Sequence, residues 1–265
     1  MIFHSVFEYN YLWLPLLGFM IGFLTSLIGG GGGFFFIPVL ILIYSVPAQI
    51  AVPTSLAASL PICIAGSVGH YRQGNINLRI GSIFALAGII GAISGAGLTS
   101  LITPEQLKTS FGIYSVLIAL HMIINTWRVK KSRTYNEDNY DKLNLKKITK
   151  SSVYGFFSGI ITGTFGTSGA APALAGLFTM RMPIKLVVGT SLLVVLVNAV
   201  SALAAHFLVG KIDLTLVYFL TAGTIIGALT GPKLLAGIKI GSKEGPIRYL
   251  YALGMIIFGI IIILT

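Results

Sequence analysis

The chain contains a succession of long apolar segments, and this pattern limits the folds open to it more than any other feature. Ten apolar runs follow one another, roughly at residues 11–28, 34–44, 50–70, 80–102, 111–127, 151–165, 170–180, 186–209, 214–236 and 247–264. A helix needs about 20 apolar residues to cross the roughly 30 Å hydrocarbon core of a bilayer. Five runs reach that length and 111–127 is marginal. We therefore predict an all-α polytopic membrane protein.

Charge and cysteine content exclude several functional classes. Only 9% of the residues are charged, against about 25% in soluble domains. The net charge of +11 comes from loops and one linker, so it indicates membrane orientation and not binding of nucleic acid. The one cysteine, Cys63, excludes a disulfide framework or a thiolate metal cluster. We expect no metal and no cofactor, and we interpret the first apolar run as a permanent segment and not a cleaved signal.

The two halves of the chain repeat each other. Special residues of the first half recur 137 residues later, and beyond the glycine-rich stretch the offset becomes 136. Matched pairs include Gly18 and Gly155, Gly22 and Gly159, Thr25 and Thr162, Pro47 and Pro183, Thr54 and Thr190, and His70 and His206. We therefore expect an N-terminal transmembrane repeat (1–127), a basic linker (128–150) and a C-terminal transmembrane repeat (151–265).

The distribution of basic residues predicts how the repeats are oriented. With the linker in the cytoplasm, 16 of the 18 lysines and arginines fall in cytoplasmic loops, and only Lys108 and Lys211 face outward. This agrees with the positive-inside rule. Both termini then lie outside, each half crosses an odd number of times, and the two five-segment repeats are inverted.

Two runs are too short to cross a membrane, and glycines precede both of them. Runs 34–44 and 170–180 would reach only about 17 Å, and they follow the glycine-rich breaks 29–33 and 166–169. Unwound backbone at membrane depth is tolerated only where protein buries it or where it lines a wet cavity. Inverted repeats with broken helices are typical of secondary transporters. Segments 11–44 and 151–180 either cross fully or re-enter, and the short second members favour partial penetration.

The breaks predict an anion site. Half-helices starting at Phe34 and Ala170 would point free N–H groups and positive dipole ends at the glycines. No acidic residue lies in any apolar run, which argues against a cation site. Thr54-Ser55 and Thr190-Ser191 open their runs and are interpreted as helix N-caps that face this space, or as caps alone. The candidate substrate-binding residues are Gly30, Gly31, Gly32, Gly33, Thr54, Ser55, Gly166, Thr167, Ser168, Gly169, Thr190, Ser191 and Asn198.

Other polar and glycine residues within the runs have less specific interpretations. Asn198 lies mid-run, where a buried amide either lines a pathway or bonds a neighbouring helix. His70 and His206 end their runs near opposite surfaces, and a structural role is favoured for both, with proton coupling as the alternative. Small-residue stripes at 91–95 and 223–231 predict close helix packing.

An enzymatic alternative rests on the second glycine break. Gly166-Thr167-Ser168-Gly169 matches the Gly-x-Ser-Gly of rhomboid-type intramembrane serine proteases, and a Ser168–His206 dyad would cleave peptides. Gly210 follows His206 by four residues where that pattern has three, and no His-rich oxyanion motif precedes it. The tandem repeat is also typical of carriers. We therefore expect a protein that is not an enzyme.

The chain is similar to the sulfite exporter family (TauE/SafE) over nearly its whole length. The resemblance rests on the glycine-rich segment 22–33, on Val52-Pro53-Thr54-Ser55 and on Val188-Gly189-Thr190-Ser191, and the 166–169 loop resembles that family's second glycine motif. It implies a multi-pass protein of the bacterial cell (inner) membrane. The implied activity is export of a small sulfur oxyanion or organosulfonate, such as sulfite or sulfoacetate.

From residues and resemblance together, we predict a carrier in the lipid bilayer that exports a small anionic substrate by alternating access. A passive anion channel is the main alternative, because it would use the same hydrogen-bond donors. It differs from a carrier in lacking saturation and alternating access. The exact cargo, a homodimeric state and the coupling of transport to protons remain open from the sequence.

Overall fold

The computed structural model describes residues 2–28, 33–129, 144–167, 169–180, 182–235 and 244–265, and within them the chain is almost entirely helical. The first half comprises β1 (Ile2–Phe3), the 3₁₀ helix η1 (Tyr9–Trp13), α1 (Leu14–Ile28), α2 (Gly33–Pro38), the π-helical turn η2 (Val39–Ile43), α3 (Ala48–Arg72), α4 (Leu78–Thr99) and α5 (Pro104–Val129). The second half comprises α6 (Leu145–Phe165), α7 (Ala170–Thr179), α8 (Ile184–Val209), β2 (Ile212–Asp213), α9 (Leu214–Leu235) and α10 (Glu244–Leu264).

Helix length and composition confirm an all-α membrane protein. Among the described residues, four helices are long and apolar enough to span a bilayer: α3, α4, α8 and the part of α5 up to Ile124. Helices α9 and α10 have 22 and 21 residues, which corresponds to about 32 Å at the helical rise of about 1.5 Å per residue.

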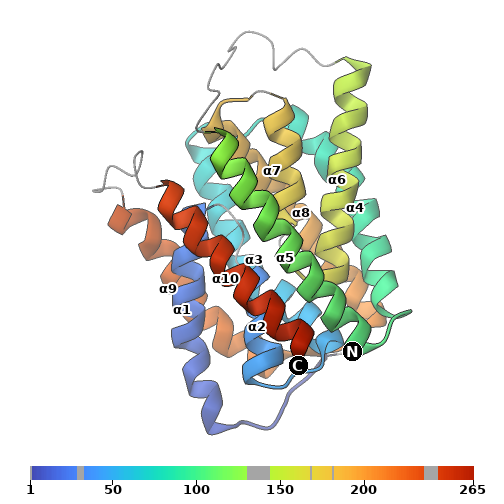
Figure 1. The fold of residues 1–265 in the computed structure, drawn as a ribbon, viewed down its shortest axis with the longest axis vertical. Helices are drawn as coiled ribbons and strands as arrows, with labels where there is room; N and C mark the ends of the chain where they lie inside the picture. The colour runs from blue at the N-terminus through green and yellow to red at the C-terminus, as the bar shows by residue number, and fades with distance from the viewer. Residues whose placement is uncertain (1, 29–32, 130–143, 168, 181, 236–243) are drawn as a thin grey trace.

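The two chain termini lie at the same end of the molecule. Figure 1 shows both of them at the bottom, whereas the end of α5 and the start of α6 lie at the top. The parallel pairing of β1 with β2 joins Ile2 to Ile212 and Phe3 to Asp213, so the end of α8 also lies at the terminal end. This arrangement agrees with the prediction that both termini lie on one side and that each half crosses an odd number of times.

The two short apolar runs form short helices. Together α2 and η2 have 11 residues, and α7 has 10, so each extends only about 16 Å. Neither can cross a roughly 30 Å hydrocarbon core. Each of the pairs α1–α2 and α6–α7 therefore contains one member too short to span a bilayer, as the partial penetration favoured by the sequence requires. Figure 1 shows α1 and α2 in the lower part of the molecule and α6 and α7 reaching its top.

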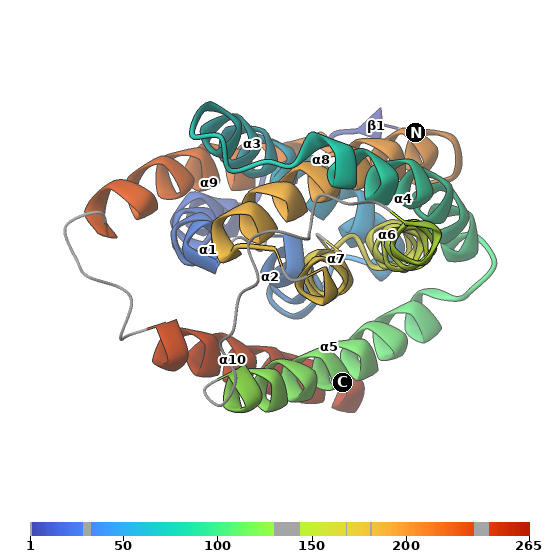
Figure 2. The ribbon, with the colours of Figure 1, turned by 90° about the horizontal axis from the view of Figure 1, so that it is seen from above.

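The helices pack in a way that is preserved when the two halves are exchanged. Helix α1 packs on α9 and α6 packs on α4, while α3 packs on α8 and α5 on α10. Exchanging the halves replaces α1 by α6 and α9 by α4, so the α1–α9 pair becomes the α6–α4 pair. The α3–α8 and α5–α10 pairs each exchange their two members and stay the same. Figure 2 shows α5 and α10 side by side as a separate layer, with α2 and α7 between this layer and the remaining helices.

Glycines permit the closest of these contacts. A Cβ added at Gly18, Gly22, Gly223 or Gly227 would collide with a backbone carbonyl across the α1–α9 pair. Across the α4–α6 pair, the same holds for Gly91, Gly95, Gly155, Gly159 and Gly163. Small residues let membrane helices approach until their backbones touch. The predicted packing stripe at 91–95 is confirmed, and the stripe predicted at 223–231 is confirmed at Gly223 and Gly227.

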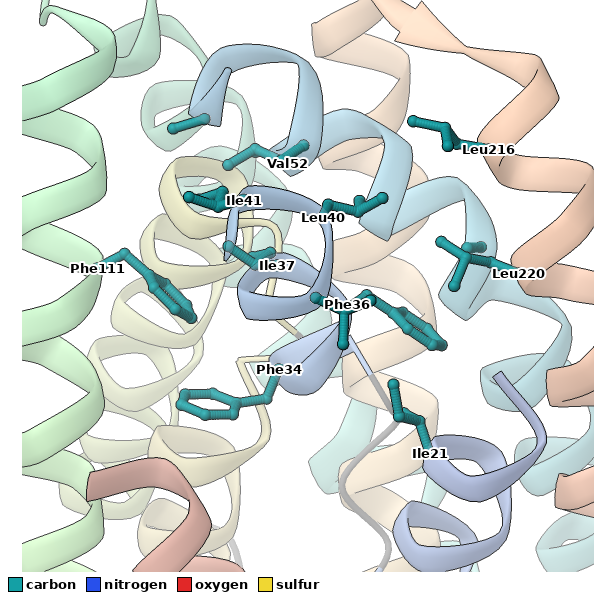
Figure 3. Packing of buried hydrophobic residues seen from close by; sticks show 14 of the residues in the cluster. Ile21, Phe34, Phe36, Ile37, Leu40, Ile41, Val52, Phe111, Leu216 and Leu220 are labelled. Atoms are coloured by element: carbon teal, nitrogen blue, oxygen red, sulfur yellow. The ribbon is translucent and has the colours of Figure 1, made fainter. Parts of the chain in front are cut away.

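Helix α2 lies in the centre of the largest apolar cluster. Its residues Phe36 and Ile37 are at most 1% exposed, and Figure 3 shows them between α9 on one side and α5 on the other. The Phe34 ring lies 5.4 Å from the ring of Phe111 on α5. Phe34, the residue that follows the first glycine break, is thus held by packing on the α5–α10 layer.

The N-cap interpretation of the two Thr-Ser pairs is wrong. Helices α3 and α8 begin at Ala48 and Ile184, with Pro47 and Pro183 at the N-cap positions, so the Thr-Ser pairs lie in the second helical turn. Pro47 has φ −54° and ψ 138°, and Pro183 has φ −53° and ψ 140°, the extended conformation typical of an N-cap residue. At the linker, residues 145–150 already belong to α6, and the Asn144 side chain accepts the first-turn N–H of Lys147.

Candidate anion site at the α6–α7 break

Two glycines shape the turn between α6 and α7. Gly166 and Gly169 have φ values of +61° and +54°, in the left-handed region that other residues rarely adopt. A Cβ at Gly166 would also meet the carbonyl of Val52, and one at Gly169 would meet Thr162 Oγ1. Both the backbone conformation and the space around it therefore require glycine at these two positions.

Two serine hydroxyls hold the carbonyl groups of this turn. Ser55 on α3 donates to the carbonyl oxygen of Gly166 at 3.0 Å, and Ser158 on α6 donates to that of Gly169 at 2.7 Å. Ser55 also lies 2.7 Å from the carbonyl of Val52 in its own helix. Both serines are at most 1% exposed. The carbonyls of Gly166 and Gly169 thereby each have a protein donor, which Gly166 shares with Val52.

Asn198 on α8 hydrogen-bonds to one of the two serines. Its Nδ2 donates to Ser158 Oγ at 3.0 Å, which extends a chain of hydrogen bonds from α8 through α6 to Gly169. The side chain is fully buried, and its Oδ1 lies against the α-carbon of Gly88 on α4. Of the two interpretations of Asn198, the structure shows the interhelical hydrogen bond; contact with a substrate stays a prediction.

Thr167 offers the hydroxyl of the turn that lacks a partner. It is 2% exposed, and its Oγ1 makes no hydrogen bond of acceptable geometry within the described part of the chain. The Tyr114 phenol on α5 is near enough to interact with it, and the Tyr114 ring stacks on Phe165 with ring centroids 5.0 Å apart. A buried hydroxyl without a partner costs about 1–3 kcal/mol, so a bound ligand that accepts from it would recover that cost.

The start of α7 supplies further donors. The first N–H groups of a helix have no acceptor within the helix, and here they belong to Ala170 and Ala171, since Pro172 has no N–H. The last carbonyl groups of α6 carry the partial negative charge of the helix dipole, and two of them have hydrogen-bond donors. Gly166 N–H caps the carbonyl of Thr162 at 2.9 Å, and His206 Nε2 lies 2.8 Å from that of Gly163.

The threonines of the two Thr-Ser pairs tie the halves of the chain together. Thr54 Oγ1 accepts the N–H of Asp213 at 3.2 Å, and Thr190 Oγ1 accepts the N–H of Asn77 at 2.9 Å. Asn77 caps the start of α4, and the Asp213 carboxylate accepts N–H groups at the start of α9. Each threonine therefore accepts a hydrogen bond from the residue that precedes a helix of the opposite half. The sequence around each threonine does not indicate this partner.

The structure thus assembles part of the predicted residue set. Ser55, Gly166, Thr167, Gly169 and, through Ser158, Asn198 meet at the α6–α7 break. Thr54 lies one residue from Ser55 but is bonded to Asp213. Thr190 and Ser191 lie elsewhere, in the second turn of α8, where Ser191 Oγ donates to the carbonyl of Val188 at 2.8 Å. Gly33 begins α2 and is buried. The remaining candidates, Gly30, Gly31, Gly32 and Ser168, lie outside the described residues.

Two residues of the site were not predicted. Ser158 could have been noticed as a polar residue inside the apolar run 151–165, in the same way as Asn198. Tyr114 gives no such signal, because aromatic residues in an apolar run are ordinary. Among the described residues, no group of three or more His, Cys, Asp or Glu side chains gathers in a way that could hold a metal ion.

The fold and this site define a polytopic membrane protein with a polar helix break, and comparison with known proteins agrees. The family model described as sulfite exporter TauE/SafE matches residues 14–262. The chain therefore belongs to the TauE/SafE family of membrane transporters.

Individual relatives carry transporter names. The chain is 32% identical over 216 residues to the "Probable membrane transporter protein YdhB" of Bacillus subtilis, covering 81% of this chain and 86% of the relative. It is 30% identical to a "Probable membrane transporter protein" of Xylella fastidiosa over 67% of each chain. It is 24% identical to YunE of Bacillus subtilis over 93% of this chain and 94% of the relative.

Proposed function

We propose that the chain is a secondary transporter that exports a small anion, either a sulfur oxyanion or an organosulfonate such as sulfite or sulfoacetate. One observation carries the proposal: in the described part of the α6–α7 break, four backbone carbonyl oxygens have protein donors, whereas several donors have no acceptor. The occupied carbonyl oxygens are those of Thr162, Gly163, Gly166 and Gly169. The remaining donors are the first N–H groups of α7 and the hydroxyl of Thr167. Donors without acceptors attract an anion.

Neutral donors suit a transporter. Described residues 151–180 around the break contain no acidic or basic side chain, so the anion is held by dipoles and hydrogen bonds and not by a fixed cation. A carrier must bind its cargo well enough to desolvate it and weakly enough to release it. The name of the family supports a sulfur oxyanion as the cargo.

The repeat supports alternating access as the transport mechanism. The pairs α1–α2 and α6–α7 lie towards opposite ends of the molecule, and helix packing is preserved when the halves are exchanged. In carriers built from inverted repeats, such a pair of halves rocks around a site at the broken helices. We propose that the two repeats are inverted and that the first break, residues 29–33, forms the other wall of the site.

Thr167→Val tests the anion site, because it removes the hydroxyl while keeping the shape of the side chain. A hydrogen bond to a charged group contributes about 1.5–3 kcal/mol, so we expect the affinity for the transported anion to fall about 10- to 100-fold. Calorimetric titration of purified protein with sulfite, sulfate, thiosulfate and sulfoacetate measures this directly. Efflux from proteoliposomes should fall in parallel.

Thr179→Val is the matched control for this experiment. Thr179 lies at the far end of α7, where its hydroxyl bonds to Gly176 of its own helix at 2.7 Å, so affinity should be unchanged. Equal affinity of Thr167→Val and the wild type would overturn the proposed site. Efflux that shows neither saturation nor counterflow would indicate a passive channel and not a carrier.

The protease alternative receives no support from His206. Its Nε2 atom, which would have to accept the proton of a nucleophilic serine, lies 2.8 Å from the carbonyl oxygen of Gly163. A carbonyl only accepts hydrogen bonds, so this nitrogen carries a proton and cannot act as the base. The family and its relatives are transporters.

We further propose that the protein lies in the cell membrane with residues 128–150 in the cytoplasm and both termini outside. The native chain is suited to a test by cysteine labelling, since its one cysteine, Cys63, is fully buried. Val6→Cys, at an 85% exposed site near the N-terminus, should react with a membrane-impermeant maleimide in intact cells. Leu145→Cys, at an 81% exposed site at the start of α6, should react only after the membrane is opened. The reverse labelling pattern would show that the protein has the opposite orientation in the membrane.

A further inference from the structure

His206 lies in the last turn of α8 and acts as a cap for the end of α6. The residue is 1% exposed, and its Nε2 is 2.8 Å from the carbonyl oxygen of Gly163, three residues before Gly166. Because the carbonyl can only accept, Nε2 carries the hydrogen. In the neutral ring, the other nitrogen, Nδ1, is then without a proton and can bind one.

Nδ1 is buried and has no hydrogen-bond partner in the part of the chain that the structure describes. It faces Gly210, where an added Cβ would lie 3.2 Å from it. Gly210, Val209 and Lys211 line a cavity of about 320 Å³ together with Pro47, Gln49, Ile50, Thr99 and Ser100. This cavity lies at the starts and ends of helices at the terminal end of the molecule. One glycine therefore separates the basic nitrogen from a cavity through which a proton can arrive.

Few other charges act on this histidine. Helix α7 and the adjoining segments of α3 (48–60), α4 (88–99) and α6 (155–165) contain no acidic or basic residue. Beyond the end of α8, Lys211 lines the cavity and opposes protonation. The Asp213 carboxylate is 3% exposed and accepts N–H groups of Ser5, Thr215 and Leu216. The carbonyl end of α6, which His206 caps, favours a positive charge.

We propose that His206 is a proton-binding site whose protonation strengthens anion binding at the α6–α7 break. This inference rests on the proposed function for its second half, since it needs an anion at the break. A proton on Nδ1 places a positive charge at the helix end that leads directly into Gly166, and an anion there stabilises that charge. Coupling between two sites is reciprocal, so the bound anion also favours protonation.

The proton site is tested independently of any anion. In protein carrying ¹⁵N-labelled histidine, the His206 signals are those missing from His206→Gln. We expect a neutral ring with hydrogen on Nε2 at high pH and conversion to imidazolium as the pH falls. A neutral ring with hydrogen on Nδ1, or a ring that stays neutral down to about pH 5, well below the ordinary histidine pKa, would overturn the assignment.

Coupling is tested by anion affinity at two pH values. Methanesulfonate and sulfoacetate are titrated into wild-type protein at about pH 5.5 and about pH 8, on either side of the ordinary histidine pKa. We expect binding about tenfold tighter at the lower pH, which corresponds to a rise of about one unit in the midpoint of the His206 titration. In His206→Gln this dependence should disappear, because glutamine can still donate to the Gly163 carbonyl but does not titrate.

His121→Gln is the matched control. His121 is an exposed histidine on α5, so this variant should keep the wild-type pH dependence. A His206→Gln variant that keeps a tenfold dependence would overturn the coupling, since a merely structural cap would affect affinity equally at both pH values. If neither sulfonate binds the wild type at either pH, the proposed function fails, whereas the ¹⁵N titration still decides whether His206 binds a proton.

Discussion

Gly91→Ala is expected to destabilise the protein strongly, although alanine is the better helix former. A Cβ at Gly91 on α4 would collide with the backbone carbonyl of Phe156 on α6. Because the obstacle is backbone and not the end of a flexible side chain, the two helices have to separate. Overpacking of this kind costs about 1–3 kcal/mol and occasionally more. Thermal unfolding of the purified protein in detergent, followed by intrinsic fluorescence, should show a marked decrease in the unfolding temperature.

Gly97→Ala provides the control on the same helix. Within the described structure, nothing lies within 4 Å of a Cβ at Gly97. Alanine in a helix interior is favoured over glycine by about 1 kcal/mol, so this variant should be as stable as the wild type or more stable. Equal behaviour of the two variants would show that the α4–α6 contact does not depend on glycine.

Gly169→Ala is expected to weaken anion binding at least about tenfold by disturbing the turn itself. The left-handed conformation costs an alanine about 1–2 kcal/mol, and its Cβ would collide with Thr162 Oγ1 and the carbonyl of Ser158. The turn must move, which breaks the bond between Ser158 and the Gly169 carbonyl and shifts the first N–H groups of α7. Each loss of about 1.4 kcal/mol weakens binding tenfold, so affinity should fall by at least about tenfold. Calorimetry with the best-bound anion measures this.

Gly74→Ala separates conformational strain from the collision. Gly74 follows α3 and has φ of +69°, and a Cβ there would meet nothing within 4 Å in the described structure. This variant should carry the same backbone cost, show a modest loss of stability and bind the anion normally. If Gly169→Ala also bound normally, the anion site would not lie at this turn.

Much of the fold could be predicted because membrane helices follow a one-dimensional rule. Long runs such as 186–209 are recognised by length alone, since the bilayer sets how many apolar residues a span needs. The short helices were expected from runs 34–44 and 170–180, which are too brief to cross. The glycine stripes were also predictable, since spacing places them on one face of a helix.

The hydrogen bonds of the site could not be predicted in the same way. Asn198 and Ser158 are both visible as polar residues in apolar runs, but 40 residues separate them. Thr54 was expected to cap its own helix, whereas it accepts the N–H of Asp213, 159 residues away. Such partners depend on which helix faces meet, and the apolar pattern of each helix leaves that choice open.

By itself, the sequence determined that this chain is a helical membrane protein with two glycine breaks, and its motifs identified the TauE/SafE family. These properties depend on composition, segment length and short motifs, which are local. The tertiary structure alone decided that Ser55 and Ser158 donate to the carbonyls of Gly166 and Gly169, while the Thr167 hydroxyl makes no hydrogen bond of acceptable geometry among the described residues. The physical reason is that a hydroxyl can either donate or accept at any neighbour within reach, and only the packed helices determine which neighbour that is.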